Sequence, residues 1–298
     1  MSFSISFVDF WQGHNPYNNI ITNTLRYYVS DNITIAEDPV DADIVFVTIY
    51  GSAHLEFIQK YRHKCILWLG ENKRPNIYNC PFSISFDFHS YSNTNFRLPL
   101  WYSEIDWFNT GLGVISIDDV LSQLVLPLKL SPSDLSDHNF CITIFNNPEG
   151  ERLYLYHLLN SYKPVTGYGR PFNNWFPTYE DYKDKLTAMS GYLFNLCPEN
   201  SYYPGYYTEK CIHAKLARTC PIYKADSHVI TDFRPSSFLN LYECRDADSL
   251  LNRVQYLDSN REALADIISE PLLHFMPSLD EFGSFIKSAV YKLLASKI

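Results

Sequence analysis

The N-terminal part of the chain alternates between apolar runs and segments in which apolar positions recur with a helical period. Residues 2–10 alternate apolar and polar positions, which predicts a strand, and residues 19–29 follow with a helical period. Two unbroken apolar runs end at Gly51 and Gly70, and residues 52–63 between them predict a crossover helix. Continuous apolar strands separated by helices are typical of a parallel sheet that is covered on both faces.

A second alternating series begins near Asn139 and has the same character. Its expected strands are residues 140–145, 191–197 and 219–223, its expected helices are 149–162 and 208–217, and 164–169 form either a turn or a short strand. Residues 126–139, between the two series, are rich in proline, serine and aspartate, which is typical of a linker. The pattern therefore predicts an α/β protein with two Rossmann-like, doubly wound domains.

The same pattern sets the expected domains at residues 1–130 and 131–275. Residues 276–298 carry apolar side chains from Phe282 to Leu294 on one helical face, so we expect an amphipathic helix that packs back on the body of the protein. Two doubly wound domains joined by one linker are expected to face each other across a cleft. In such sheets ligands bind beyond the carboxyl ends of the strands, so the loops there are the place to look for chemistry.

Composition narrows the class of protein. Of the 298 residues 46% are hydrophobic, which is enough for two cores, and the net charge of -9 argues against binding to nucleic acid. The seven cysteines include no C-x-x-C pair, which indicates reduced thiols and a cytoplasmic protein. Because no segment reads as a signal peptide or a transmembrane helix, we expect no integral membrane segment, and a peripheral place at the inner face of a membrane stays open.

The loop after residues 191–197 leads into a helix that begins near Thr208, a residue suited to the N-cap. The first amide groups of a helix are free and attract anions such as phosphate. Lys210 lies just inside this helix start, where the helix dipole disfavours a cation unless an anion lies between them. The alternative is an ordinary solvated lysine.

Two more charged residues follow predicted strands. Arg152 lies in the first turn of the helix 149–162, and arginine suits bidentate phosphate contacts. Together with Lys210 it indicates a diphosphate, although an exposed arginine without a ligand would look the same. Glu71 directly follows the apolar run that ends at Gly70, and it is either a solvated side chain or, opposite a diphosphate, a candidate general base.

Several blocks of the sequence resemble one family. The stretch FNLCPENSYYPGYYTEKCIHAKLARTCPIY resembles the donor-binding motif of the α1,3/4-fucosyltransferases, glycosyltransferase family 10, of the bacterial type. Further family blocks are matched in the same order by four other stretches: GENKRPN, RLPLWY, NNPEGERLYLYHLL and DFRPSSFLNLYECRDADSLL. The resemblance extends over about Val40 to Ala265, which is most of the chain.

The resemblance implies a B-type glycosyltransferase fold and inverting transfer of L-fucose from GDP-fucose to an acceptor glycan. Residues 1–130 would be the acceptor-side domain and 131–275 the GDP-sugar-binding domain. Glu71 matches the family's proposed base, and the matched donor-binding positions are Arg152, Asn200, Tyr206, Glu209 and Lys210. No metal and no further cofactor are expected. An Asp-x-Asp sequence would be the usual sign of a metal that binds the nucleotide, but the Asp-Ala-Asp sequences at 41–43 and 246–248 are predicted to be structural caps.

The sequence departs from the family pattern beside the donor motif. Pro198 stands where the family often has an aromatic residue, and Lys224 and Ala225 replace a Trp-Gly pair. Two alternatives therefore remain: transfer of another GDP-deoxysugar in surface polysaccharide synthesis, and a non-catalytic sugar-nucleotide-binding protein. The family implies an acceptor such as the GlcNAc of a lactosamine-type chain or a bacterial surface glycan.

Overall fold

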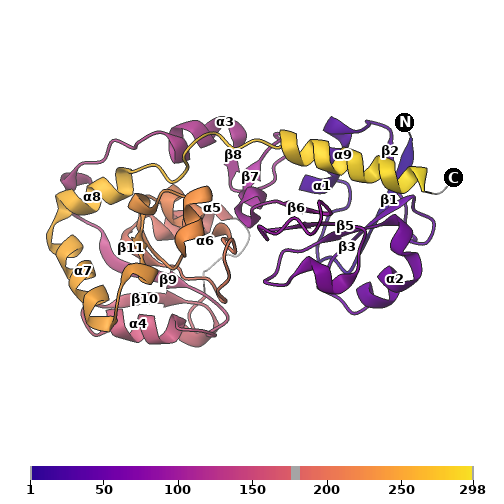
Figure 1. Ribbon diagram of the computed structural model, residues 1–298. Coiled ribbons are helices and arrows are strands. Elements are labelled where there is room, and N and C mark those ends of the chain that lie inside the picture. The colour runs from indigo at the N-terminus through magenta and orange to yellow at the C-terminus, as the bar shows by residue number, and fades with distance from the viewer. Residues whose placement is uncertain (1, 176–181, 297–298) are drawn as a thin grey trace. The chain divides into compact units, whose positions relative to one another are not determined.

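The computed structural model describes residues 2–175 and 182–296, with side chains described outside 176–183. The chain divides into two compact units (Figure 1). The first comprises Met1–Leu112 together with Pro277–Ile298, and the second comprises Gly113–Met276. The division lies earlier than the boundary expected at residue 130. The reason is local packing: the carbonyl of Leu124 accepts a hydrogen bond from the amide of Leu273, which ties this segment to the second unit.

The first unit is built on a six-stranded parallel sheet with the order β2-β1-β3-β4-β5-β6. Its strands are β1 (Phe3–Val8), β2 (Ile33–Ile35), β3 (Ile44–Val47), β4 (Cys65–Trp68), β5 (Phe82–Ser85) and β6 (Asn95–Arg97), and its short β7 is Ile105–Asp106. All four residues of β3 are buried, as the unbroken apolar run predicts. Helix α2 (His54–Tyr61) covers one face of the sheet and α1 (Ile20–Tyr28) covers the other.

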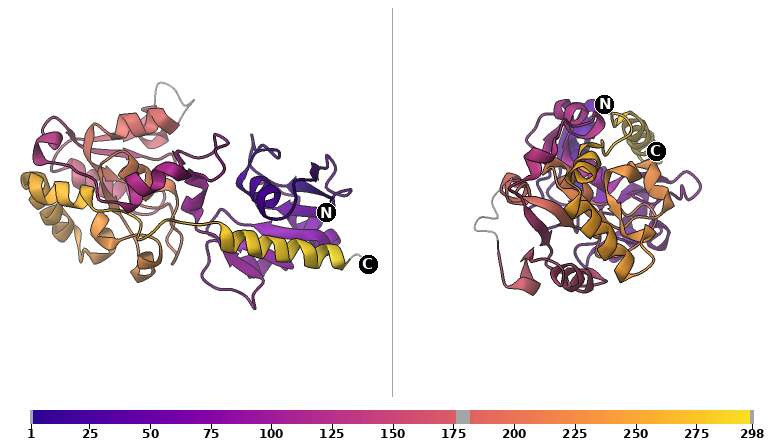
Figure 2. Two further views of the ribbon diagram at one scale, coloured as in Figure 1. Left: turned by 90° about the horizontal axis from the view of Figure 1, so that it is seen from above. Right: turned by 90° about the vertical axis from the view of Figure 1, so that its left-hand side faces the viewer.

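The last helix, α9 (Asp280–Ala295), packs on the first unit beside α1, as Figures 1 and 2 show. Its buried stripe includes Phe282, Ile286 and Val290, and these side chains share a core with β1 and β3. A Cβ at Gly283 would lie 2.4 Å from the ring of Tyr28, so glycine permits the close approach of the two helices. The amphipathic pattern predicted helix α9, and the tertiary structure shows that it packs on the first unit.

The second unit is built on a five-stranded parallel sheet with the order β10-β9-β11-β12-β13. They are β9 (Asn139–Ile144), β10 (Val165–Tyr168), β11 (Tyr192–Leu196), β12 (Cys220–Tyr223) and β13 (Leu239–Asn240), and β8 is Ile115–Ser116. The helices are α3 (Ile117–Val120), α4 (Arg152–Asn160), α5 (Tyr182–Met189), α6 (Glu209–Leu216), α7 (Ala247–Ser259) and α8 (Arg261–Ser269). One core cluster joins α4, α7 and α8 to the sheet.

Both Asp-Ala-Asp sequences have structural roles, as predicted, but only the second is a helix cap. Asp43 accepts hydrogen bonds from the amide and hydroxyl of Ser4 at 2.8 and 3.0 Å. Asp246 is the N-cap of α7, where it accepts from the amide of Ser249 at 2.8 Å. All seven cysteines are free thiols, as their spacing indicated. Of the helices in the described ranges, none has both the length and the apolar character needed to cross a membrane.

Lys215 holds α6 in place from inside the core. Only 2% of this residue is exposed, and its Nζ donates to the carbonyl oxygens of Ile267 and Ile268 at 3.0 and 2.8 Å. Burial lowers the pKa of Lys215 from 10.5 to about 8, against the smaller opposing effects of Cys220, Cys211 and Glu270.

A pH-dependent stability difference is expected from this residue. Between pH 8 and 10.5 the unfolded chain still holds the Lys215 proton and the folded chain has lost it. The destabilising effect of the buried charge is therefore complete below pH 8 and disappears as the pH rises through this window. The unfolding free energy of the wild type, minus that of Lys215→Met, should increase from pH 8 to pH 10.5 in urea titrations. A flat difference would show that Lys215 is not titrating there.

Candidate functional site

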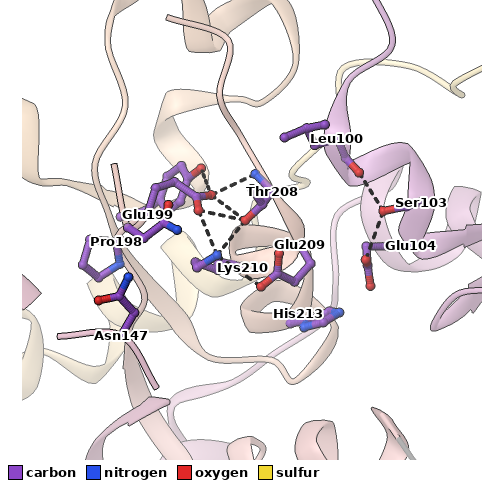
Figure 3. A network of polar contacts seen from close by, with 12 residues as sticks. Leu100, Ser103, Glu104, Asn147, Pro198, Glu199, Thr208, Glu209, Lys210 and His213 are labelled. Atoms are coloured by element: carbon purple, nitrogen blue, oxygen red, sulfur yellow. Dashed lines mark hydrogen bonds and ion pairs between the residues drawn. The ribbon is translucent and has the colours of Figure 1, made fainter. Parts of the chain in front are cut away.

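Glu199 is the centre of a polar network beyond the carboxyl ends of β11 and β12 (Figure 3). Its Oε1 accepts hydrogen bonds from the amide and hydroxyl of Thr208 and from the hydroxyl of Tyr223, each at 2.8 Å. Its Oε2 lies 2.8 Å from the Nζ of Lys210. The Glu199 side chain is 5% exposed. Since β11 and β12 are adjacent and parallel, their ends bring the loop residue Glu199 and the strand residue Tyr223 together.

Lys210 lies at the start of a helix, as expected, but its partner is a carboxylate of the chain instead of the expected phosphate. Lys210 lies in the first turn of α6, where its Nζ contacts Glu199, the hydroxyl of Thr208 at 2.7 Å and Glu209 at 3.2 Å. Although burial opposes the charge, the two carboxylates raise the pKa of Lys210 well above its ordinary value. The anion that offsets this cation is thus supplied by the chain itself, so the cation alone does not require a phosphate. Thr208 is the N-cap, but its side chain makes no capping hydrogen bond.

Glu209 is the more accessible acid of the network, since its side chain is 32% exposed. Burial works against its ionisation, but Lys210, Lys185 and His213 together lower the pKa of Glu209 well below its ordinary value. The Nζ of Lys185 lies 2.9 Å from the Nδ1 of His213, which places a further positive group near the start of α6. Glu209 is therefore ionised at neutral pH and can accept hydrogen bonds.

Arg152 begins α4, as the sequence predicts, but its guanidinium is turned to the backbone. Its Nε and Nη2 donate to the carbonyl of Pro198 at 3.2 and 2.9 Å, and its Nη1 donates to the carbonyl of Asn147 at 3.0 Å. Only 4% of the residue is exposed, and burial lowers the pKa of Arg152 despite the nearby Glu199 and Glu209. Arg152 thus joins the loops that follow β9 and β11.

The two remaining predicted donor residues lie on the same loop. Tyr206 is buried, its amide donates to the carbonyl of Tyr203 at 3.0 Å, and its phenol interacts electrostatically with Arg152. Asn200 is half-buried, and its Oδ1 accepts from the hydroxyl of Ser201 at 3.4 Å. Arg152, Tyr206, Glu209 and Lys210 are thus gathered around the Glu199 network, with Asn200 next to Glu199 in the chain.

Lys224 and Ala225 have clear structural partners at the end of β12. The Nζ of Lys224 lies 2.8 Å from Oε1 of Glu151, immediately before α4, and 5.8 Å from the ring centroid of Tyr202. Ala225 is fully buried, and its amide and carbonyl both bond to the side chain of Asn240, at 3.1 and 2.9 Å. The departure from the family pattern therefore adds a salt bridge between the end of β12 and the start of α4.

Glu71 lies in the first unit, in the loop that follows β4, and is half-buried. Its neighbour is Tyr50, which follows β3. A Cβ at Gly70 would lie only 2.8 Å from the Tyr50 hydroxyl, so the glycine lets the phenol approach this loop. Burial, followed by the charge of Glu71 and a side-chain hydrogen bond to it, raises the pKa of Tyr50 to about 12.

Sequence analysis did not place Glu199, Tyr223 and Tyr50 in the site. Glu199 lies inside the recognised motif, but a lone glutamate in a loop gives no sign of the four groups that converge on it. Within residues 2–175 and 182–296, no group of three or more histidine, cysteine, aspartate or glutamate side chains could hold a metal ion.

Two parallel α/β sheets with charged side chains beyond the carboxyl ends of their strands define a doubly wound, ligand-binding class of protein. Residues 5–103 match the model of the alpha-(1,3)-fucosyltransferase FucT N-terminal domain, and residues 138–267 match that of the glycosyltransferase family 10 (fucosyltransferase) C-terminal region. The chain belongs to glycosyltransferase family 10, the fucosyltransferase family.

The alpha-(1,3)-fucosyltransferase FucT of Helicobacter pylori is 28% identical in an alignment that is 304 positions long and covers 95% of this chain. This chain spans 62% of the length of that relative. A crystal structure of an alpha1,3-fucosyltransferase superposes with a TM-score of 0.76 at 24% identity, covering 97% of this chain and 90% of the other. An alpha1,3-fucosyltransferase whose crystal structure was solved with GDP-fucose superposes with a TM-score of 0.68 at 23% identity. That superposition also covers 97% of this chain and 90% of the other. These similarities confirm the predicted fold class, two Rossmann-like domains of the glycosyltransferase B type.

Proposed function

We propose that this chain is an inverting α1,3-fucosyltransferase that moves L-fucose from GDP-fucose to a hydroxyl of an acceptor glycan. The observation that carries the proposal is the network of Glu199, Thr208, Lys210 and Tyr223. It joins both ends of the family's donor motif at the sheet edge where doubly wound proteins bind nucleotides. The alpha1,3-fucosyltransferases of the same fold have been solved with GDP and with GDP-fucose, which supports the choice of donor.

In this proposal the second unit binds the donor. Lys210 and the free amides at the start of α6 contact the diphosphate, and Arg152 adds positive charge from behind the loop carbonyls that it holds. Asn200, Tyr206 and Glu209 line the nucleotide and fucose positions. The pairing of Lys210 with Glu199 fixes the direction of the ammonium group before the ligand arrives, so little reorganisation is needed when charge develops on the leaving group.

The first unit supplies the base. Glu71 accepts the proton of the acceptor hydroxyl while that oxygen forms a bond to the anomeric carbon of fucose. The bond from this carbon to the β-phosphate oxygen breaks, its electron pair leaves with GDP, and the configuration inverts. The proton passes from Glu71 to solvent. The proposed acceptor is the GlcNAc of a lactosamine-type chain or a bacterial surface glycan, and the reduced thiols support a cytoplasmic setting.

Lys224 favours a second candidate, a transferase of another GDP-deoxysugar. The Lys224–Glu151 pair occupies the end of β12, where the family pattern has Trp-Gly, and the nearby rings of Tyr202 and Tyr242 are stacked at 6.1 Å. A non-catalytic binding protein is the weaker alternative, because it would have no use for a base at Glu71.

A donor screen tests the proposal. We expect GDP and GDP-fucose to raise the melting temperature, GDP-mannose to raise it less, and UDP-sugars to have no effect. A ligand that binds only the folded state stabilises it by about 2.7 kcal/mol at 100 times its Kd, so binding is visible as a shift in melting temperature. Transfer to N-acetyllactosamine is then followed by mass spectrometry, and NMR of the product reports the anomeric configuration. Stabilisation by a UDP-sugar alone would refute the proposed donor.

Activity is expected to survive EDTA. Lys210, Arg152 and the start of α6 supply the positive potential that a divalent cation supplies in metal-dependent transferases. The measurement is the initial rate of transfer with and without EDTA, with dialysed enzyme as the control. Complete loss of activity that only manganese or magnesium restores would show that the reaction depends on a metal.

A further inference from the structure

Three neighbouring strands of the first unit end in residues with the chemistry of a sugar site. In the sheet order β1-β3-β4, the loops at the carboxyl ends carry Trp11, Tyr50 and Glu71 respectively. Both aromatic side chains are exposed, with 45% of Trp11 and 43% of Tyr50 accessible to solvent. Their ring centroids are 5.8 Å apart at 88°, an edge-to-face pair. The proposed mechanism uses Glu71 and leaves this aromatic pair without a role.

The loop that carries Tyr50 is held firmly. Asp9, at the end of β1, accepts hydrogen bonds from the amide and Nδ1 of His54 at 2.7 and 2.8 Å, and its carbonyl accepts from the amide of Tyr50 at 3.1 Å. The indole of Trp11 is supported from behind by the rings of Phe10 and His14, at 5.5 and 5.0 Å. An exposed pair held this way loses little conformational entropy when a ligand binds.

Tyr50 also connects the aromatic pair to the proposed base. Its hydroxyl lies against Gly70, where a Cβ would be only 2.8 Å away, and Gly70 directly precedes Glu71, whose charge helps to raise the pKa of Tyr50. A hydrogen bond from a held phenol restricts the directions in which a carboxylate can point.

We propose that Trp11 and Tyr50 bind the acceptor sugar, with the indole against the apolar face of its ring and the Tyr50 hydroxyl positioning Glu71 toward the hydroxyl that reacts. This inference rests on the proposed function. A flat apolar surface beside a carboxylate matches a neutral sugar, which offers an apolar face and hydroxyl donors. An anionic membrane surface is a poor match, because it would be repelled by Glu71 and by a chain with a net charge of -9.

The test separates binding from turnover, with N-acetyllactosamine as the probe. Trp11→Ala should raise the acceptor KM at least about tenfold, in line with the loss of one aromatic contact, and should leave kcat and GDP affinity near wild type. Trp11→Phe, which keeps a ring, should give an intermediate KM. Tyr50→Phe should lower kcat roughly tenfold and leave the acceptor KM and GDP affinity unchanged, since it removes one hydrogen bond to a charged group.

The matched controls are Tyr27→Ala and Tyr27→Phe on α1, because Tyr27 is an exposed aromatic residue of the same unit, at 72%. Both should behave as wild type. An unchanged acceptor KM in Trp11→Ala, or an unchanged kcat in Tyr50→Phe, overturns the corresponding assignment. If the wild type binds GDP-fucose and transfers fucose neither to N-acetyllactosamine nor to a bacterial surface glycan, the proposed function fails and this inference fails with it. If the wild type transfers fucose and the variants match it, only this inference fails.

Discussion

Replacing Glu71 by glutamine is expected to lower turnover by roughly 10²–10⁴-fold, the usual contribution of a general base. Glutamine has nearly the same shape as glutamate, but it cannot accept the acceptor's proton. GDP affinity should be nearly unchanged, because Glu71 belongs to the first unit and the proposed donor residues belong to the second. The measurements are kcat, corrected for the folded fraction, and GDP affinity by calorimetry.

Glu56→Gln is the matched control for this experiment. Glu56 is an exposed carboxylate on α2 of the same unit, so its replacement makes the same change in charge without touching the loops after β3 and β4. Its turnover should equal that of the wild type. Near-wild-type turnover of Glu71→Gln would remove this residue from the mechanism and make Glu209, the more exposed acid beside Lys210, the next residue to test.

The second large effect is expected at Lys210. In Lys210→Met the Glu199 carboxylate, 5% exposed, loses its ion-pair partner. Removing one member of a buried pair typically costs about 3–5 kcal/mol, and the unfolding free energy should fall by an amount of this order. GDP affinity should fall at least tenfold, about 1.4 kcal/mol, because the diphosphate loses a charged contact.

The double variant Glu199→Gln/Lys210→Met separates these two effects. Glutamine at position 199 is uncharged and can still accept from Thr208 and Tyr223, so much of the lost stability should return. The loss of GDP affinity should remain, because the ammonium group is still absent. Urea unfolding measures the first quantity and calorimetry the second. Recovery of both stability and GDP affinity would mean that Lys210 acts only through Glu199 and never contacts the nucleotide.

Local patterns were sufficient for the longer elements of the fold. An alternating pattern predicted β1, and apolar runs predicted β3, β4, β9, β11 and β12. The helical periods predicted α1, α2, α4, α6 and α9. The strands β2, β5, β6, β7, β8 and β13 were missed, because segments of two to four residues are too short to show a period and are held by their neighbours in the sheets. The helices α3, α5 and α8 also went unpredicted, and of α7 only the cap at Asp246 was expected.

The sequence by itself determined the family, the two-domain α/β class and the charged residues at the ends of strands. Only the tertiary structure decided what those charges touch. The sequence does not show which group a charged side chain contacts. The position of Lys210 at a helix start suggested a phosphate ligand, and in the fold its ammonium group pairs with Glu199. Arg152 looked like an open phosphate ligand, and the fold turns it to the carbonyls of Asn147 and Pro198. Partners of this kind come from separate loops that meet because parallel strands end at one edge, a proximity that no local pattern records.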